Sequence, residues 1–163
     1  MSVAYSNPVL LTAFFAELPQ LIYDEGIVEE IYLDSLGFPT FGIGSLITED
    51  DQEYGYEVGT PISEGRILQA FIDEFVFKVF PDVVYVYPDY RSMPQEAVQI
   101  AMNLLYQLGR YNYYTGPKPF KNHVAAMKRG DWKEAAAELR DSELYRRQAK
   151  KRTERRAIRL EKL

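Results

Sequence analysis

Apolar side chains recur every three or four positions over most of the chain, a spacing typical of helices that bury one face. Between these stretches lies one segment of alternating apolar and polar residues, followed by an acidic stretch without a period. The pattern predicts helices over residues 8–18, 64–79 and 94–108, two more within 120–145, and a basic one over 146–163.

Residues at the ends of these segments support the predicted boundaries. Asn7, Ser63 and Asp131 each stand directly before an apolar helical stretch, where a short polar side chain can accept a hydrogen bond from the first turn. Pro19 and Pro81 follow two of the stretches, and proline disrupts a helix interior. We therefore expect the first helix to stop at about Leu18 and the second at Val79.

The alternating segment predicts a β-hairpin. Residues 30–34 and 39–43 read as two strands around a turn at 35–38. The acidic residues 48–61 read as a surface loop with room for a short third strand or a helical turn. A small antiparallel sheet followed by helices places the chain in the α+β class.

Composition restricts the chemistry open to this chain. Its 163 residues, 47% of them hydrophobic, suffice for one domain with a core. There is no cysteine, and His123 is the sole histidine, so we expect no disulfide, metal site, serine triad or cofactor. The apolar stretch near the N-terminus lacks a basic leader and is interrupted by Glu17, which favours a buried amphipathic helix over a signal peptide.

The candidate chemistry lies in and around the hairpin. Glu25 and Asp34 are nine residues apart, and Thr40 follows six residues later. Two carboxyl groups and a hydroxyl can hydrolyse a glycosidic bond: one carboxyl protonates the leaving oxygen, and the other groups hold and activate a water. Taken singly, each residue is also common at a helix end, a turn or a strand.

This segment resembles the catalytic segment of the T-even phage lysozymes, glycoside hydrolase family 24. The resemblance rests on Glu25-Gly26, on Asp34 before the turn glycine Gly37, and on the stretch 40–44, Thr-Phe-Gly-Ile-Gly. It extends over about residues 20–160. It is strongest at 24–46 and clear again at 103–145.

The resemblance implies a lysozyme-like α+β fold in a single domain. Residues 1–62 would form an N-terminal lobe with an additional N-terminal helix and the hairpin. Residues 63–80 would be a linking helix, and residues 81–163 a helical C-terminal lobe.

The resemblance also assigns catalytic roles. Glu25 would be the general acid, Asp34 would position a water and stabilise positive charge on the sugar ring, and Thr40 would hold that water. The reaction would be a direct displacement with inversion, for which the two carboxyl groups are expected roughly 6.5–9.5 Å apart.

Five further residues follow from the same comparison. Leu46, Tyr106, His123 and Glu138 match positions of the substrate cleft, although His123 and Glu138 are not the residue types of the family. Tyr106 could equally be a core aromatic residue. Arg152 matches an arginine that pairs with the catalytic acid, with Arg155 and Arg156 as close rivals.

Two features depart from the family. Ser45 stands where the family has a histidine paired with a downstream aspartate, a change expected to affect stability more than chemistry. The chain also has about a dozen additional N-terminal residues, which form the helix after Asn7. We expect this helix to dock on the lobe or on another protein, such as a phage tail or baseplate protein.

Charge divides the chain. Residues 1–90 carry 16 acidic and 2 basic side chains, a balance of −14, whereas residues 91–163 carry 8 acidic and 17 basic ones, a balance of +9. The basic half could face an anionic bacterial wall, or it could be a solvated helix surface. No nucleic-acid motif accompanies the charge, and no segment is long and apolar enough for membrane insertion.

Three functions remain open at this point. The first is a muramidase acting on peptidoglycan, either as an endolysin of the host cytoplasm that reaches the wall through membrane holes or as a lysozyme of the phage virion. The second is a lysozyme-like structural or binding component of a virion, without activity. The third is a chitosanase or chitinase on a related fold.

Overall fold

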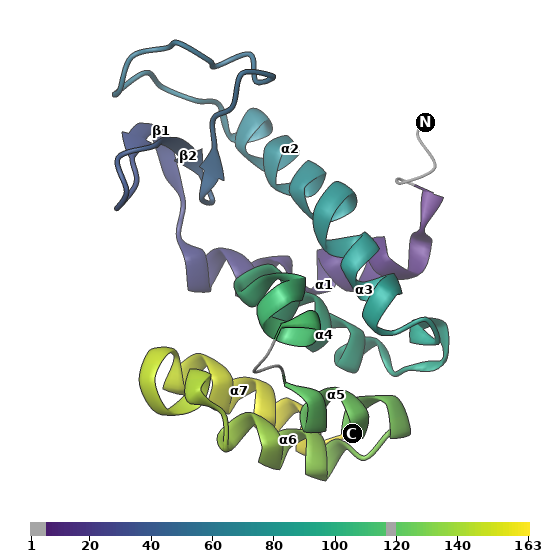
Figure 1. Cartoon of the computed structure of the whole chain (residues 1–163). Helices are drawn as coiled ribbons and strands as arrows, with labels where there is room; N and C mark the ends of the chain where they lie inside the picture. Colours follow the sequence, from purple (N-terminus) through teal and green to yellow (C-terminus); the bar gives the residue numbers. More distant parts are fainter. Residues whose placement is uncertain (1–5, 117–119) are drawn as a thin grey trace. The chain divides into compact units, whose positions relative to one another are not determined.

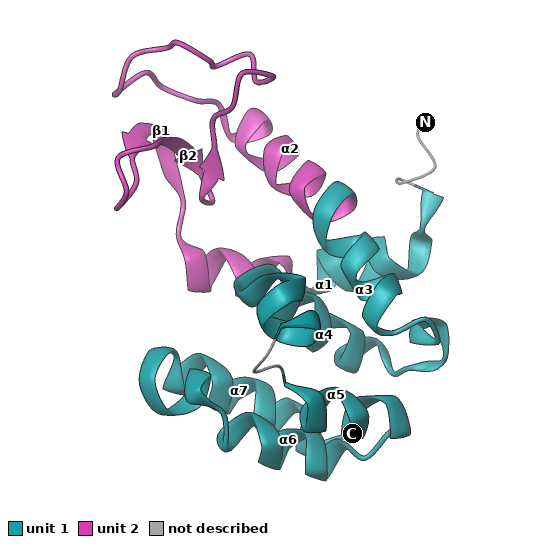
Figure 2. Cartoon of the chain, viewed as in Figure 1, with its two compact units in different colours: residues 1–17, 77–163 teal, residues 18–76 magenta. Residues whose placement is uncertain are grey.

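The computed structural model describes residues 6–116 and 120–163 and has the predicted α+β class. Figure 1 shows the course of the chain, and by its internal contacts the chain separates into two units (Figure 2). Unit 2 is the continuous segment Leu18–Val76, and unit 1 combines residues up to Glu17 with Phe77–Leu163. This division differs from the expected N-terminal lobe of residues 1–62, because the chain up to Glu17 packs with the C-terminal helices.

The first helix, α1 (Pro8–Glu25), begins as predicted. The side-chain oxygen of Asn7 accepts a hydrogen bond from the Leu10 amide at 3.2 Å. Leu10 and Phe14 have no exposed surface, so the additional N-terminal helix does pack within unit 1.

The predicted stop of this helix at Leu18 is wrong, because α1 continues through Pro19 to Glu25. An interior proline removes one helical hydrogen bond and costs about 3 kcal/mol. Leu21 on the far side of the proline is fully buried in the core of the protein, and its burial helps to offset that cost. Gly26 follows the end of the helix. Its amide donates to the Ile22 carbonyl, and its φ of 76° suits glycine.

Unit 2 contains a three-stranded antiparallel sheet in the order β1 (Val28–Leu33), β2 (Pro39–Gly42) and β3 (Ser45–Leu46). The hairpin is thus confirmed, with its first strand two residues earlier than expected and the third strand before the acidic loop. Residue 30 of β1 also forms an isolated bridge with residue 61.

The sheet packs on α2 (Glu64–Glu74), whose cap Ser63 accepts a hydrogen bond from the Arg66 amide. Gly42 lies so close to this helix that a Cβ added there would be 2.7 Å from Ile67, so the strand requires glycine at this point. Arg66 also anchors the acidic loop, since its Nε lies 2.6 Å from the buried carboxylate of Glu53.

The linking helix does not end before Pro81, which corrects the second proline prediction. After α2 the chain widens into a π-helical turn, Phe75–Val79, and continues as α3 (Phe80–Val86). Pro81 then falls in the first turn of α3, where its missing N–H is not needed.

Unit 1 is built around α4 (Gln95–Arg110), which is buried continuously from Ala97 to Leu105. A short 3₁₀ turn, Tyr90–Ser92, precedes α4, and the helix kinks at Gly109, where φ is 70°. The remaining elements are the π-helical turns Tyr111–Thr115 and Leu144–Gln148 and the helices α5 (Lys121–Arg129), α6 (Trp132–Arg140) and α7 (Lys150–Glu161). The predicted cap of α6 is confirmed, because Asp131 accepts a hydrogen bond from the Glu134 amide.

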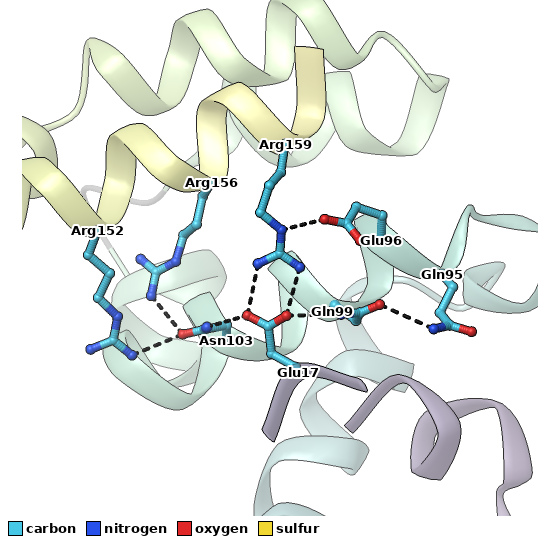
Figure 3. Close-up of polar contacts among 8 residues, drawn as sticks. All are labelled: Glu17, Gln95, Glu96, Gln99, Asn103, Arg152, Arg156 and Arg159. Carbon is cyan, nitrogen blue, oxygen red and sulfur yellow. Dashed lines mark hydrogen bonds and ion pairs between the residues drawn. The ribbon is translucent and has the colours of Figure 1, made fainter. Parts of the chain in front are cut away.

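A buried polar network joins α1, α4 and α7 within unit 1 (Figure 3). Glu17 is 1% exposed, and both of its carboxylate oxygens accept hydrogen bonds from Arg159, at 2.9 and 2.7 Å. Gln99 and Asn103 of α4 donate to the same carboxylate at 3.0 and 2.7 Å. Glu96 of α4 is a second partner of Arg159.

Asn103 extends the network toward the start of α7. Its Oδ1 accepts hydrogen bonds from Arg156 at 2.7 Å and from Arg152 at 3.0 Å. Arg156 is itself 2% exposed and donates to Gln107 at 2.8 Å. Basic side chains that the sequence assigned to a solvated face or an anionic surface thus fill part of the core.

The charges of this network stabilise one another. Burial by itself raises the pKa of Glu17, but Arg159, Asn103 and Gln99 together hold that pKa below its ordinary value. Glu17 is therefore ionised at neutral pH although it is buried.

Candidate active site

Glu25 is the last residue of α1 and lies in unit 2 with an exposed side chain. Gly26 follows with a positive φ and turns the chain into β1. A carboxyl group at this helix end is accessible to a substrate without displacement of any core residue.

Asp34 directly follows β1 and organises the hairpin turn. Its Oδ1 accepts hydrogen bonds from the amides of Leu36 and Phe38, both at 2.9 Å. Its backbone amide donates to Phe38 O at 2.9 Å, and its carbonyl accepts from Gly37. Oδ2 makes no hydrogen bond with the described residues, so one oxygen is fixed while the other remains available as an acceptor.

Thr40 lies on β2 and is 4% exposed. Its hydroxyl donates to Phe38 O at 3.0 Å, which leaves the oxygen lone pairs as acceptors. The sheet register pairs Thr40 with Tyr32, two residues before Asp34, and also with Leu46 on the other side. Glu25, Asp34 and Thr40 thus belong to one unit, and the sheet fixes Thr40 beside the strand that leads into Asp34.

Leu46 of β3 is half exposed, with 50% of its surface accessible. Directly opposed residues of an antiparallel pair share a face of the sheet. The register therefore puts Leu46 on the face of Thr40, as an apolar surface next to the candidate catalytic residues.

The other predicted cleft residues lie in unit 1. Tyr106 is a partly buried residue of α4. His123 and Glu138 line one cavity of about 600 Å³, between residues of α4, α5, α6 and the two π-helical turns that flank them. Tyr106 does not line this cavity, although the sequence comparison placed all three residues in one cleft.

His123 is 1% exposed, which makes it a core residue as well as a cavity residue. Its Nδ1 lies 2.8 Å from the Ala135 carbonyl, while Nε2 has no hydrogen-bond partner among the described residues. Burial is the main reason that its pKa falls from 6.5 to about 4, and the charge of Arg156 lowers it further. At neutral pH the imidazole is therefore uncharged, with Nδ1–H donating and Nε2 accepting.

Arg152, the predicted partner of Glu25, donates to Asn103 within unit 1. Its pairing with Glu25 stays a prediction, as do the rival assignments of Arg155 and Arg156. For Arg156 the described contacts are to Asn103 and Gln107, within the core.

Ser45, which the resemblance matches to a histidine, is 8% exposed. Its Oγ makes no hydrogen bond within the described part of the chain. Ser45 is therefore a small buried residue at the start of β3.

The pH dependence of stability should reveal the buried state of His123. Because its folded pKa of about 4 lies below the ordinary 6.5, the unfolded chain binds the proton first, and stability falls as pH drops from 6.5 toward 4. The loss from this group is about 3 kcal/mol over that range. Urea unfolding at several pH values measures it.

The matched variant for this experiment is His123→Gln, which keeps a neutral polar side chain. Since His123 is the sole histidine, no other side chain has an ordinary pKa between 5 and 6.5. We expect the variant to show a flatter stability profile in that range. A wild-type and a variant profile of equal slope would contradict a neutral buried imidazole.

Within residues 6–116 and 120–163, no group of three or more His, Cys, Asp or Glu side chains could hold a metal ion. None of the described helices combines the length and the apolar composition that a membrane crossing requires.

The structure combines an acidic residue at a helix end, Glu25, with a hairpin that carries Asp34 and Thr40 and with a helical unit. These features define a lysozyme-like protein of the α+β class. No family model matches the chain. A curated relative, "Probable T4-type lysozyme 1" of Dictyostelium discoideum, is 26% identical over 143 residues, which are 75% of this chain and 80% of the relative. The chain is thus similar to a T4-type lysozyme, and the match supports a lysozyme-like function.

Proposed function

We propose that this protein is a muramidase that cleaves the β-1,4 bond between N-acetylmuramic acid and N-acetylglucosamine in peptidoglycan. The observation that carries the proposal is the hairpin geometry. It fixes one oxygen of Asp34 and the hydroxyl hydrogen of Thr40 and leaves acceptor positions on both residues. The similarity to a T4-type lysozyme supports the same class of reaction.

Glu25 is the general acid in this mechanism. Its exposed carboxyl group at the end of α1 donates a proton to the glycosidic oxygen as the bond to that oxygen breaks. Positive charge then develops on the sugar ring, and the ionised carboxylate of Asp34 stabilises it.

Asp34 and Thr40 orient the attacking water. A water that donates one hydrogen to Asp34 Oδ2 and the other to Thr40 Oγ1 directs its lone pair at the anomeric carbon, and Asp34 accepts the proton as the new bond forms. The attack comes from the face opposite the leaving oxygen, so the configuration inverts. Such a pair of carboxyl groups is expected roughly 6.5–9.5 Å apart.

The remaining predicted residues bind and position the glycan. Leu46 offers an apolar surface beside Thr40, and Tyr106 can stack on a sugar ring and hydrogen-bond it. His123 and Glu138 supply acceptors in the cavity of unit 1. We assign Arg152 as the partner of Glu25 on the sequence resemblance. The hydrogen bond that Arg152 donates to Asn103 lies within unit 1.

We propose a phage setting for this activity. A free endolysin would accumulate in the host cytoplasm and reach the wall through membrane holes made by another protein. A virion lysozyme would instead open the wall during entry, and the partner would be a tail or baseplate protein. The exposed Phe15 of α1 is available for such a contact.

The test is the clearing of outer-membrane-permeabilised Gram-negative cells by the purified chain, with the new sugar ends identified. A muramidase of this mechanism gives a reducing muramic acid end, which appears first as the α-anomer because a β bond was inverted. Absence of clearing by folded protein would contradict the proposal and favour a structural virion component. Cleavage of chitin or chitosan instead would make the chain a different glycoside hydrolase.

A further inference from the structure

Unit 1 has a surface on which tyrosine rings and basic side chains alternate. Tyr85 of α3 and Tyr114 of the π-helical turn Tyr111–Thr115 meet edge to face, with their ring centroids 6.1 Å apart. The guanidinium of Arg110 lies 4.7 Å from the centroid of the Tyr85 ring, and Nζ of Lys128 lies 5.0 Å from that of Tyr114. These four side chains come from α3, the end of α4, the turn and α5, and they form one continuous cluster.

Exposed apolar side chains border this cluster. Tyr85 and Tyr111 each keep more than half of their surface accessible, and Val84 is exposed beside Tyr85. Pro81 lies one turn earlier on the same side of α3 and is exposed as well. Exposed apolar patches of this kind mark interaction sites. We call the set the tyrosine surface; it comprises Pro81, Val84, Tyr85, Arg110, Tyr111, Tyr114 and Lys128.

The segment that supplies most of the tyrosine surface carries only positive charge. Residues 97–130 contain five basic and no acidic residues, although the chain has 24 acidic side chains in all. Asp82 of α3 pairs with Arg110 at 3.4 Å and offsets that one charge, whereas Lys128 makes no ion pair with a described residue. Apolar rings with basic side chains among them are complementary to a partner that offers anionic groups and hydrocarbon together.

We propose that the tyrosine surface docks on a membrane of anionic phospholipids, an inference that goes beyond the proposed function. The phosphate groups of the lipids accept charge-assisted hydrogen bonds from Arg110 and Lys128. Tyrosine rings prefer the boundary between headgroups and acyl chains, and Val84 and Pro81 lie toward the acyl side of that boundary. The protein rests on the membrane and does not cross it.

A membrane accounts for the apolar side chains as well as for the charges. A phosphate-bearing polysaccharide would satisfy Arg110 and Lys128 equally well, but it offers no hydrocarbon against which Val84 and the tyrosine rings can be buried. For an enzyme that degrades the wall, docking would also concentrate the chain at the membrane beneath the peptidoglycan.

The first experiment is sedimentation of the full chain with two kinds of vesicle, one of phosphatidylcholine alone and one that also contains phosphatidylglycerol. We expect binding to the anionic vesicles that weakens with added salt, because salt screens the attraction. Absence of binding to the anionic vesicles overturns the proposal. Equal binding to both kinds overturns it as well, because the basic side chains would then contribute nothing.

Two variants remove separate parts of the surface. Arg110→Gln with Lys128→Gln removes two positive charges and should weaken binding to the anionic vesicles about 25-fold, about 5-fold for each basic residue. Tyr85→Ser should weaken it about 10-fold, because the exposed ring no longer buries apolar area. Unfolding in urea checks that both variants remain folded.

The control variants make the same changes elsewhere on the chain. Arg147→Gln with Lys151→Gln removes two exposed charges at the C-terminal end of unit 1, and Tyr54→Ser removes an exposed ring of unit 2. Losses confined to the tyrosine surface support the proposal. Equal losses in the controls would show attraction through overall charge or scattered apolar residues and would overturn it.

Soluble polyphosphate is the probe for an anionic polymer in place of a membrane, since it carries phosphate charge without hydrocarbon. If it binds as tightly as the anionic vesicles, and Tyr85→Ser weakens neither, the surface recognises a polymer and the membrane proposal is overturned. Wall clearing by the same preparation is independent of these results. Clearing without vesicle binding overturns only this inference, and vesicle binding without clearing contradicts only the muramidase.

Discussion

Replacement of Glu25 by Gln should abolish wall clearing while the protein remains folded and still binds the wall. The amide has the size of the carboxyl group but cannot donate a proton to the glycosidic oxygen. General acid–base catalysis contributes about 10²–10⁴-fold to a rate, and a loss of that size is expected. Stability should change little, since Glu25 is an exposed residue at a helix end.

The measurement is the initial rate of turbidity loss, together with sedimentation of the protein with purified walls. Glu49→Gln is the matched control, because Glu49 is an exposed glutamate of the acidic loop in the same unit. Clearing by Glu25→Gln at the wild-type rate would remove Glu25 from the mechanism. An equal loss in Glu49→Gln would point to surface charge instead of acid catalysis.

The largest effect on stability is expected for Glu17→Ala. This change removes the buried carboxylate that accepts hydrogen bonds from the Nη groups of Arg159. It also removes the acceptor of Gln99 and Asn103. Removal of one member of a buried ion pair costs about 3–5 kcal/mol. The free energy of unfolding in urea at pH 7 measures this loss.

Two controls separate the buried network from charge in general. Asp141→Ala removes the carboxylate of an exposed pair with Arg146 and should cost at most about 1 kcal/mol. The double change Glu17→Leu with Arg159→Met removes both buried charges and should recover most of the loss. A small effect of Glu17→Ala, similar to that of Asp141→Ala, would show that the network adds little.

The stability contributed by the pair of Glu17 and Arg159 depends on pH. Because the folded pKa of Glu17 is lowered, its contribution is fully present above the ordinary value of 4.5 and is lost as pH falls through the folded pKa. Since the pKa values of Glu53, Glu154 and Glu161 are lowered as well, the difference between the wild type and Glu17→Ala at each pH isolates the contribution of Glu17.

Local rules predicted the elements of this fold well but failed where distant contacts override them. The caps at Asn7, Ser63 and Asp131 and the hairpin depend on neighbouring residues, and all were confirmed. Both proline boundaries were wrong. Pro19 is retained within a helix that has buried residues on either side, and the π-helical turn before Pro81 lets a new helical segment begin there.

The buried network shows what a single sequence could not disclose. Glu17 looked like an interruption of an apolar stretch, because its partner Arg159 is 142 residues away. A lone acid within an apolar helix, together with arginines at helical spacing in α7, was the available signal. Pairing them required the fold. The resemblance predicts His123 and Glu138 in one cleft, and both line the cavity of unit 1, but its other walls come from several elements whose packing the sequence pattern does not specify.

The link between Glu17 and Arg159 also bears on the order in which the chain acquires structure during synthesis. Unit 2 is one continuous segment, so all of its partners have been made once residue 76 has left the ribosome. In unit 1, by contrast, the carboxylate of Glu17 has no Arg159 to pair with until α7 has left the ribosome. Contacts so far apart in sequence also form slowly. On the nascent chain, the unit that carries Glu25, Asp34 and Thr40 can therefore fold before the unit that contains the cavity.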